Sequence, residues 1–173
     1  MRNIELKARV ADWDAVREIA KKIATEYLGV ERQVDTYFHC AQGRLKLREI
    51  DGKQAQLVWY DRVDQQSPKT SDYNLVPVLD PETLKSILTT ALGVRAVVDK
   101  RREIFLVENV RIHLDEVAGL GQFIEFEVVL GRDADEELGH AAIKRLREKF
   151  SIADSALISG SYGELVIGAR ETP

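Results

Sequence analysis

Apolar and polar residues alternate strictly in the first patterned segment of the chain. Residues 3–10 read Asn3-Ile4-Glu5-Leu6-Lys7-Ala8-Arg9-Val10. Because successive side chains of a β-strand point to opposite faces, this pattern predicts a strand with one apolar and one charged face. The same period of two predicts further strands over 30–40, 44–50, 55–62, 94–107, 110–117 and 122–130. A short edge strand is expected over 73–78, since Pro77 is tolerated mainly at the edge of a sheet.

Apolar residues recur at helical spacing in three other segments. The first predicted helix covers about 13–27, the second runs from Asp80-Pro81 to Gly93, and the third spans 133–150. The predicted buried stripes are Leu84, Ile87, Leu88 and Leu92 in the second helix, and Leu138, Ala142, Leu146 and Phe150 in the third. Residues 63–72 have the composition of a loop, and 157–166 are expected to form a short helical element.

The order of these elements predicts an α+β fold. Strands joined by hairpins imply a largely antiparallel sheet, with the helices packed outside it. The chain has 173 residues, a length that fits a single domain over 1–173. Hydrophobic residues make up 45% and charged residues 31% of the chain, which is typical of a globular protein and not of a disordered one.

The composition excludes several classes of protein. A single cysteine permits no internal disulfide and no zinc site built on thiolates. No apolar run reaches the ~18 residues of a membrane-spanning helix, and the first residues contain no apolar signal core. A net charge of −4 argues against nucleic acid, because domains that bind it are usually basic. We therefore expect a cytoplasmic protein without a membrane or nucleic-acid partner.

The predicted strands carry many charged residues, which are depleted from ordinary strands. Five segments place such residues two positions apart, and so on one face: Glu5/Lys7, Lys46/Arg48, Lys100/Arg102, Arg111/His113/Asp115 and Glu125/Glu127. One interpretation is a sheet whose charged face meets water. The alternative is a sheet closed into a barrel, whose charged face lines a lumen.

The segment Glu125-Phe126-Glu127 favours the closed barrel. Its two carboxylates lie side by side and repel each other unless a cation lies between them. The basic pairs lie on other strands, so acids and bases form separate clusters, as expected for a polyanion site with metal ions. A two-residue turn at Glu108-Asn109 also places Arg102 opposite Asp115, on one face of the predicted hairpin.

The hairpin at Asp51-Gly52 constrains the register of the neighbouring strands. A two-residue turn there would put Arg62 on the face opposite to Lys46 and Arg48. A three-residue loop with a bulge puts all three on the same face, and we predict that bulge. On this register Tyr60 lines the lumen.

Several segments, in this order, resemble motifs of a known family. They are Asn3-Ile4-Glu5-Leu6-Lys7, Gln33-Val34-Asp35-Thr36-Tyr37-Phe38, Gly43-Arg44-Leu45-Lys46-Leu47-Arg48-Glu49, Ser71-Asp72-Tyr73, Val98-Asp99-Lys100-Arg101-Arg102, His113-Leu114-Asp115-Glu116-Val117-Ala118-Gly119-Leu120-Gly121, Phe123-Ile124-Glu125-Phe126-Glu127 and Ser161-Tyr162-Gly163-Glu164-Leu165. Together they resemble the CYTH proteins, also called triphosphate tunnel metalloenzymes, and most of all their class IV adenylyl cyclase branch. The resemblance implies a closed eight-stranded antiparallel β-barrel, a triphosphate tunnel, with helices packed outside. It also implies a nucleoside or inorganic triphosphate as ligand, bound together with Mg²⁺ or Mn²⁺.

The resemblance further implies which residues form the site. Glu5, Glu125 and Glu127 would hold the metal and serve catalysis, with Asp115 as a fourth acidic ligand. Six basic residues would bind the phosphates: Lys7, Lys46, Arg48, Arg62, Lys100 and Arg102. The chemistry agrees, because Mg²⁺ prefers carboxylate and phosphate oxygens and guanidinium groups bind phosphate through paired hydrogen bonds. Asn3 departs from the glutamate of the family motif, so the site has one negative charge less.

Three activities fit these residues. The first is a phosphorus–oxygen lyase, in which the ribose 3′-hydroxyl of ATP attacks the α-phosphorus to give cyclic AMP and pyrophosphate. The second is hydrolysis, in which water attacks the terminal phosphorus of tripolyphosphate, thiamine triphosphate or a nucleotide. The third is a non-catalytic module that binds nucleotide or polyphosphate, for which Asn3 leaves room. The edge strand near Tyr73 further suggests a homodimer.

Overall fold

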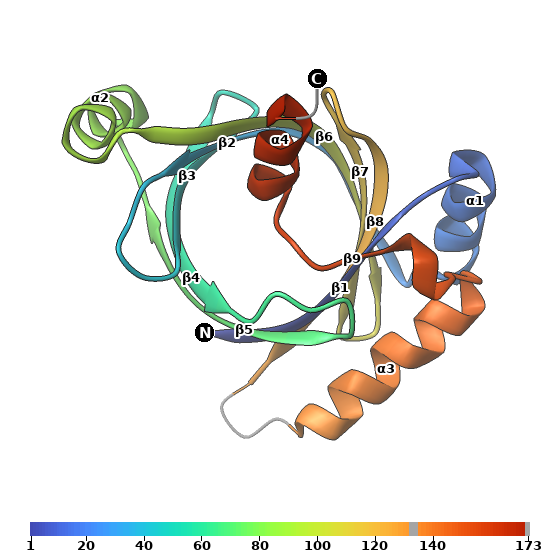
Figure 1. Cartoon of the computed structure of the whole chain (residues 1–173). Helices are drawn as coiled ribbons and strands as arrows, with labels where there is room; N and C mark the ends of the chain where they lie inside the picture. The colour runs from blue at the N-terminus through green and yellow to red at the C-terminus, as the bar shows by residue number, and fades with distance from the viewer. Residues whose placement is uncertain (132–134, 172–173) are drawn as a thin grey trace.

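The computed structural model describes residues 1–131 and 135–171, and a closed antiparallel barrel dominates it (Figure 1). Eight strands follow one another in the order β5-β4-β3-β2-β6-β7-β8-β1, and β1 pairs with β5 to close the sheet. Their bounds are β1 Arg2–Arg9, β2 Glu26–Phe38, β3 Arg44–Ile50, β4 Gln54–Arg62, β5 Lys69–Pro77, β6 Val94–Val107, β7 Val110–Val117 and β8 Gly121–Leu130. The predicted fold class is confirmed.

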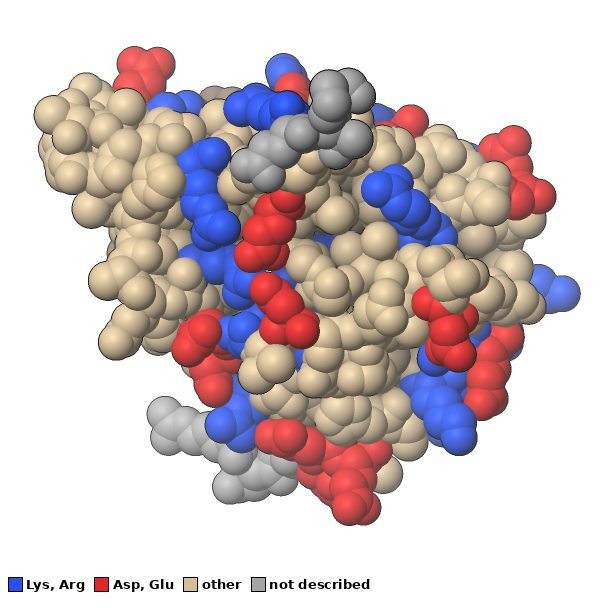
Figure 2. Space-filling model, in the orientation of Figure 1, with Lys and Arg blue, Asp and Glu red and all other residues tan. Residues whose placement is uncertain are grey.

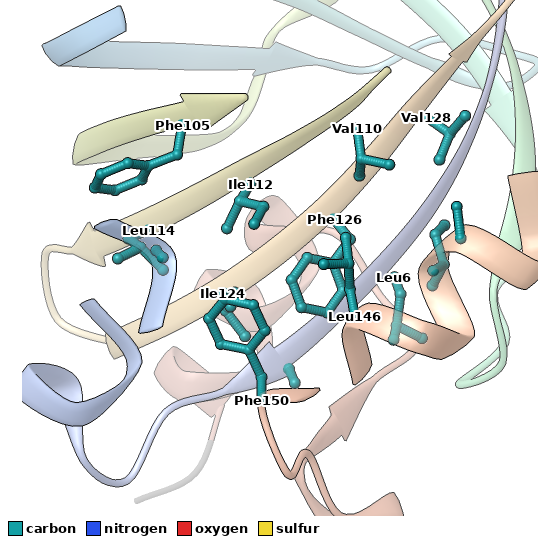
Figure 3. Close-up of a cluster of buried hydrophobic side chains, with 14 of the residues drawn as sticks. Leu6, Phe105, Val110, Ile112, Leu114, Ile124, Phe126, Val128, Leu146 and Phe150 are labelled. Carbon is teal, nitrogen blue, oxygen red and sulfur yellow. The ribbon is translucent and has the colours of Figure 1, made fainter. Parts of the chain in front are cut away.

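The apolar face of the barrel wall points outward, where helices cover part of it. The helices α1 (Trp13–Ile23) and α3 (Glu136–Lys149) pack over β1, β6 and β8. In this core Ile112 is fully buried, and the rings of Phe126 and Phe150 lie 5.3 Å apart (Figure 3). Burial of such side chains stabilises the fold by about 1.5–3 kcal/mol each. The charged face is thereby left to line the inside.

Aspartate residues begin the three helices outside the barrel. The side chains of Asp12, Asp80 and Asp135 accept hydrogen bonds from the first-turn amides of α1, α2 (Pro81–Leu92) and α3. The helix α2 lies against β2 and β3, while α4 (Tyr162–Glu171) lies across one end of the barrel (Figure 1). Within the described residues, all four helices are too short or too polar to cross a membrane.

Some predicted element boundaries are wrong. The first helix ends at Ile23, since β2 begins at Glu26, and Gly29 (φ +102°) lies at a β-bulge instead of a helix end. The predicted stripe of the second helix is also wrong: Leu84 and Leu88 are half-buried, and Ile87 and Leu92 are exposed. In the third helix Leu138 is exposed as well, and the predicted first residue, Asp133, lies outside the described residues.

The structure corrects two further predictions, for residues 63–72 and for residues 157–166. The strand β5 begins at Lys69, inside the predicted loop 63–72, and pairs with β4 on one side and β1 on the other. The part of β5 that pairs with β1 is therefore no edge, but among the described residues 74–77 pair with β4 alone, as expected for an edge at Pro77, and the homodimer stays a prediction. The predicted helical element 157–166 is a two-residue strand, β9 (Leu157–Ile158), which pairs with β1, followed by the start of α4. A 3₁₀ turn over Asp154–Ala156 precedes β9.

Both predicted hairpin registers are confirmed. Val107 pairs with Val110 across the turn at 108–109. At the other hairpin the Lys53 amide donates to the Ile50 carbonyl, and the ladder then resumes with Ile50 opposite Gln54. Lys53 is thus the extra residue that brings the even-numbered positions of β3 and β4 to the same face.

Candidate functional site

A cavity of about 540 Å³ occupies the inside of the barrel. Nine of the ten predicted site residues line it: Glu5, Lys7, Lys46, Arg48, Arg62, Lys100, Arg102, Glu125 and Glu127. Tyr60 lines it too, as the predicted register requires. In Figure 2, which looks along the barrel, basic and acidic side chains lie next to each other near the centre of the view.

The helix α4 closes one end of this cavity. Tyr162 at its start is buried, and its hydroxyl donates to Asp115 over 2.7 Å. A Cβ at Gly163 would lie 3.1 Å from the ring of Tyr37, so the helix approaches β2 closely. Glu164 fixes the helix to the wall, because its carboxylate accepts from Arg44 over 2.7 Å. The cavity is therefore a pocket with one closed end.

Three cations and one carboxylate form a cluster on β2, β3 and β6. The Asp35 carboxylate accepts from Arg48 twice at 2.7 Å and from Lys46 at 2.9 Å, and it lies 3.4 Å from Lys100. Burial opposes ionisation of Asp35, but Arg48, Lys100 and Lys46 outweigh it and hold its pKa well below the usual range. Burial, together with the charge of Arg48, lowers the pKa of Lys46 to about 8. Burial and Arg102 lower the pKa of Lys100 well below its usual value.

Carboxylates gather on the opposite wall, formed by β1 and β8. Glu5 and Glu127 are direct cross-strand partners, and Lys7 is the partner of Glu125. The Lys7 ammonium lies 2.9 Å from Glu125, and His113 Nδ1 lies 3.1 Å from the same carboxylate. Burial disfavours the charged form of Glu125, yet Lys7 and Arg102 keep its pKa well below the usual range. The wall thus holds the carboxylate of Glu125 in its ionised form close to Glu5 and Glu127.

Comparison with known protein families agrees with this arrangement of cations and carboxylates. A model described as the CYTH domain matches residues 1–159. The chain belongs to the CYTH domain family. It is a triphosphate-tunnel protein, since the closed barrel with an ionic interior is the architecture of that superfamily.

Relatives of this CYTH protein share its length as well as its fold. A protein of Methanocaldococcus jannaschii named "Putative adenylate cyclase MJ0240" is 26% identical over 174 residues, covering 95% of this chain and 98% of that protein. The structure of the PH1012 protein from Pyrococcus horikoshii OT3 has a TM-score of 0.85 at 24% identity, covering 95% and 99% of the two chains. A structure named a putative adenylate cyclase from Vibrio parahaemolyticus has a TM-score of 0.78 at 22% identity, covering 95% and 97%.

A more distant structural neighbour shows how widely this CYTH barrel is used. The Pct1 RNA triphosphatase of Schizosaccharomyces pombe, in complex with the Spt5 CTD, has a TM-score of 0.53 at 10% identity. The similarity covers 96% of this chain and 81% of Pct1. At such low identity the comparison supports the fold alone.

The surroundings of Asn3 show whether the residues of this CYTH site fit a divalent cation. It is 5% exposed and lines the cavity, its amide nitrogen donates to Glu127, and its Oδ1 has no partner among the described residues. An unsatisfied buried carbonyl oxygen beside Glu5 and Glu127 is a donor set that suits Mg²⁺ or Mn²⁺. In this structure the carboxylates of Glu5 and Glu127 are each paired with an arginine. In the described part of the chain, no group of three acidic, His or Cys side chains is arranged to hold a metal.

Asp115 is the predicted site residue that does not line the cavity. It is completely buried, and its two oxygens accept from Arg102 at 2.7 and 2.6 Å while Tyr162 donates to one of them. Burial opposes its ionisation, but Arg102 lowers its pKa to about 2. In this arrangement Asp115 positions Arg102, while its predicted role as a metal ligand stays a prediction.

The sequence missed Lys69, because it lies in the segment predicted as a loop. Lys69 is 2% exposed, and its ammonium donates to the carbonyls of Gln65, Ile158 and Ser159. Burial, with the charge of Arg62, lowers its pKa to about 8. Its contacts tie the loop before β5 to the segment before α4. Period-two spacing from Tyr73 back to Lys69 is the signal that identifies this part of β5.

Proposed function

We propose that this CYTH protein is a metal-dependent enzyme that converts ATP to cyclic AMP and pyrophosphate. The observation that carries the proposal is the division of one closed-ended pocket into two walls. Cations of β3 and β6 face carboxylates of β1 and β8 across it. A neutral or singly charged substrate would leave most of these cations unmatched, whereas a triphosphate matches several of them.

The cationic residues bind and orient the phosphate chain. Arg48 and Arg102 already have rigid orientations, because Asp35 and Asp115 each hold a guanidinium through two hydrogen bonds. Fixed donors of this kind stabilise charge that develops on a leaving pyrophosphate without reorganising during the reaction. Lys7, a cation on the carboxylate wall, reaches both Glu125 and the ring of Tyr162.

The carboxylates supply the metal site. Glu5, Glu125 and Glu127 would hold Mg²⁺ or Mn²⁺, with Asn3 Oδ1 as a neutral oxygen beside them. Such an ion, when bound, lowers the pKa of a coordinated hydroxyl and neutralises phosphate charge. In the proposed reaction the ribose 3′-oxygen forms a bond to the α-phosphorus, the bond to the bridging oxygen breaks, and pyrophosphate leaves with its electron pair. The proton of the hydroxyl passes to solvent.

The names of relatives support a cyclase without establishing it. The M. jannaschii relative covers nearly the whole chain and is named "Putative adenylate cyclase MJ0240", and the V. parahaemolyticus structure is named "a putative adenylate cyclase" too. Product analysis separates the activities. Incubation of the protein with Mg²⁺ or Mn²⁺ and ATP, and separately with tripolyphosphate, is expected to give cyclic AMP and pyrophosphate from ATP only.

Two other outcomes overturn the proposed reaction. Release of inorganic phosphate from either compound would identify a triphosphatase. Tight binding of both compounds without any product would identify a binding module. Glu82→Gln, an exposed change in the first turn of α2, is the matched control for substitutions of glutamates in the pocket.

A further inference from the structure

Apolar side chains surround the open end of the pocket, opposite to α4. Leu28 of β2, Ile50 of β3, Leu75 of β5 and Ile104 of β6 all line the cavity, and Leu28 is 50% exposed. They belong to one end because Ile50 pairs with Gln33 on β2, and Ile104 pairs with Gly29, which follows Leu28. Phosphate oxygens gain nothing from such a surface, since apolar groups cannot solvate charge. The rim therefore contributes nothing to the binding of inorganic triphosphate.

Gln33 adds a specific polar group to this rim. Its side chain is buried at 3% exposure, its Nε2 donates to Glu31 over 2.7 Å, and its Oε1 has no partner in the described part of the chain. The amide orientation is fixed by chemistry, because the reverse orientation would place Oε1 against the Glu31 carboxylate. Gln33 thus presents an acceptor alone, and a buried acceptor without a donor is costly.

Tyr73 contributes a flat aromatic surface on the far side of the same opening. It lines the cavity from β5, is partly buried, and pairs across the ladder with Tyr60. Aromatic rings stack on planar heterocycles and so suit a nucleobase. The distance along the wall also fits, because Ile50 is two residues beyond Arg48 on β3, a rise of about 6.8 Å. The rim therefore begins about 6.8 Å farther toward the open end than the predicted phosphate-binding cations.

We propose that the apolar rim, comprising Leu28, Ile50, Leu75, Ile104, Tyr73 and the acceptor of Gln33, binds the base of a nucleoside triphosphate that carries an exocyclic amino group. This inference rests on the proposed function, in that the phosphates occupy the cationic wall. It adds that the pocket selects an organic triphosphate over an inorganic one. An amino-bearing base supplies the N–H that Gln33 Oε1 lacks, while the rim buries the faces of the heterocycle.

Binding measurements with three probes test this selection. The probes are α,β-methylene-ATP, whose bridging carbon blocks cyclisation, the same compound with a purine base that lacks the 6-amino group, and inorganic tripolyphosphate. Calorimetry in Mg²⁺ is expected to show the adenine compound binding at least tenfold more tightly than tripolyphosphate. Loss of the amino group is expected to weaken binding roughly five- to tenfold, as for one buried hydrogen bond.

Substitutions in the rim test whether its residues cause the preference for the amino-bearing nucleotide. Gln33→Leu is expected to remove the preference for the 6-amino group and to leave tripolyphosphate binding unchanged. Leu28→Ser is expected to weaken binding of both nucleotides several-fold. Val30→Ser is the matched control, because Val30 lies on the same strand, is 39% exposed and does not line this cavity.

Failure of the inference can be distinguished from failure of the proposed function. Equal affinity for tripolyphosphate and both nucleotides, unchanged in Gln33→Leu and Leu28→Ser, overturns base recognition and leaves a triphosphate site. If none of the three probes binds, the triphosphate function itself is overturned, and base recognition with it.

Discussion

Asp35 holds Arg48 through two parallel hydrogen bonds, each 2.7 Å long, from Nε and Nη2. The same carboxylate contacts Lys46 and Lys100, so one buried anion organises three cations of the predicted phosphate site. Bidentate pairing fixes the guanidinium plane as well as its position. Asp35 itself does not line the cavity, and we interpret it as a positioning residue.

Asp35→Asn is expected to destabilise the protein by about 3–5 kcal/mol, because three buried cations lose the carboxylate that they share. A triphosphate restores negative charge to the same cations. Tripolyphosphate is therefore expected to raise the melting temperature of the variant by more than it raises that of the wild type, in thermal scans at fixed ligand concentration. An equal rise in both proteins would mean that Asp35 has a structural role only. Asp99→Asn, which removes an exposed partner of Arg32, is the control.

The affinity for a triphosphate is expected to fall as the pH rises through 8. Lys46 has a pKa of about 8, lowered by burial and by Arg48, so it is charged below this pH and neutral above it. The charged form attracts phosphate, and binding therefore takes up a proton and weakens by at most about tenfold per pH unit above 8. Calorimetry with α,β-methylene-ATP between pH 7 and 9.5, at constant Mg²⁺, measures this decline.

Lys46→Arg separates this effect from other titrations. A guanidinium stays protonated throughout the same range, so the variant is expected to show a flatter pH dependence of affinity. An identical slope in the wild type and the variant would assign the titration to another group and contradict the role of Lys46.

Glu127→Gln is expected to lower turnover by at least about 100-fold, since even changes outside the ligand shell of a metal commonly cost 10–100-fold. The free energy of unfolding is expected to stay equal or to rise, because the change relieves repulsion between Glu127 and its cross-strand partner Glu5. Isothermal titration with Mn²⁺ gives a second readout, a weaker metal affinity. Glu116→Gln, on the outer side of β7 with an exposed Arg101 partner, controls for loss of charge alone. Unchanged Mn²⁺ affinity in the Glu127 variant would contradict the assignment.

The inward-facing residues could be predicted because a strand has only two faces. Once Lys46 and Arg48 share a face, the hairpin register decides that of Arg62, and the extra residue Lys53 was predictable from the charges alone. The cross-strand pairing of the acidic residues was harder to predict from the sequence. The alignment of Glu5 with Glu127 depends on β1 meeting β8, two strands that are far apart in the sequence.

Residues 69–72 of β5 could not be recognised as a strand because this part of it lacks the usual contrast between its faces. Polar residues lie on both faces, with Lys69 and Ser71 buried and Asp72 exposed, and a segment of this composition is typical of a loop. The partners of Asp35 could not be predicted either, since they come from two other strands, β3 and β6. The stripe of α2 was misjudged for a different reason: the pattern is amphipathic, but the helix only rests on β2 and β3 and leaves Ile87 exposed.

Two glycines with similar backbone angles are expected to respond differently to alanine. Gly43 has φ +65° and Gly119 has φ +75°, so a side chain at either position costs about 1–2 kcal/mol. At Gly119 a Cβ meets no atom within 4 Å, whereas at Gly43 it would lie 2.7 Å from the Tyr60 carbonyl oxygen and 3.0 Å from the ring of Trp59. Because a backbone atom cannot give way without moving β4, Gly43→Ala is expected to be destabilised by about 2 kcal/mol more than Gly119→Ala. Denaturant unfolding of both variants measures the difference, and equal values would show that the β3–β4 hairpin yields to the added methyl group.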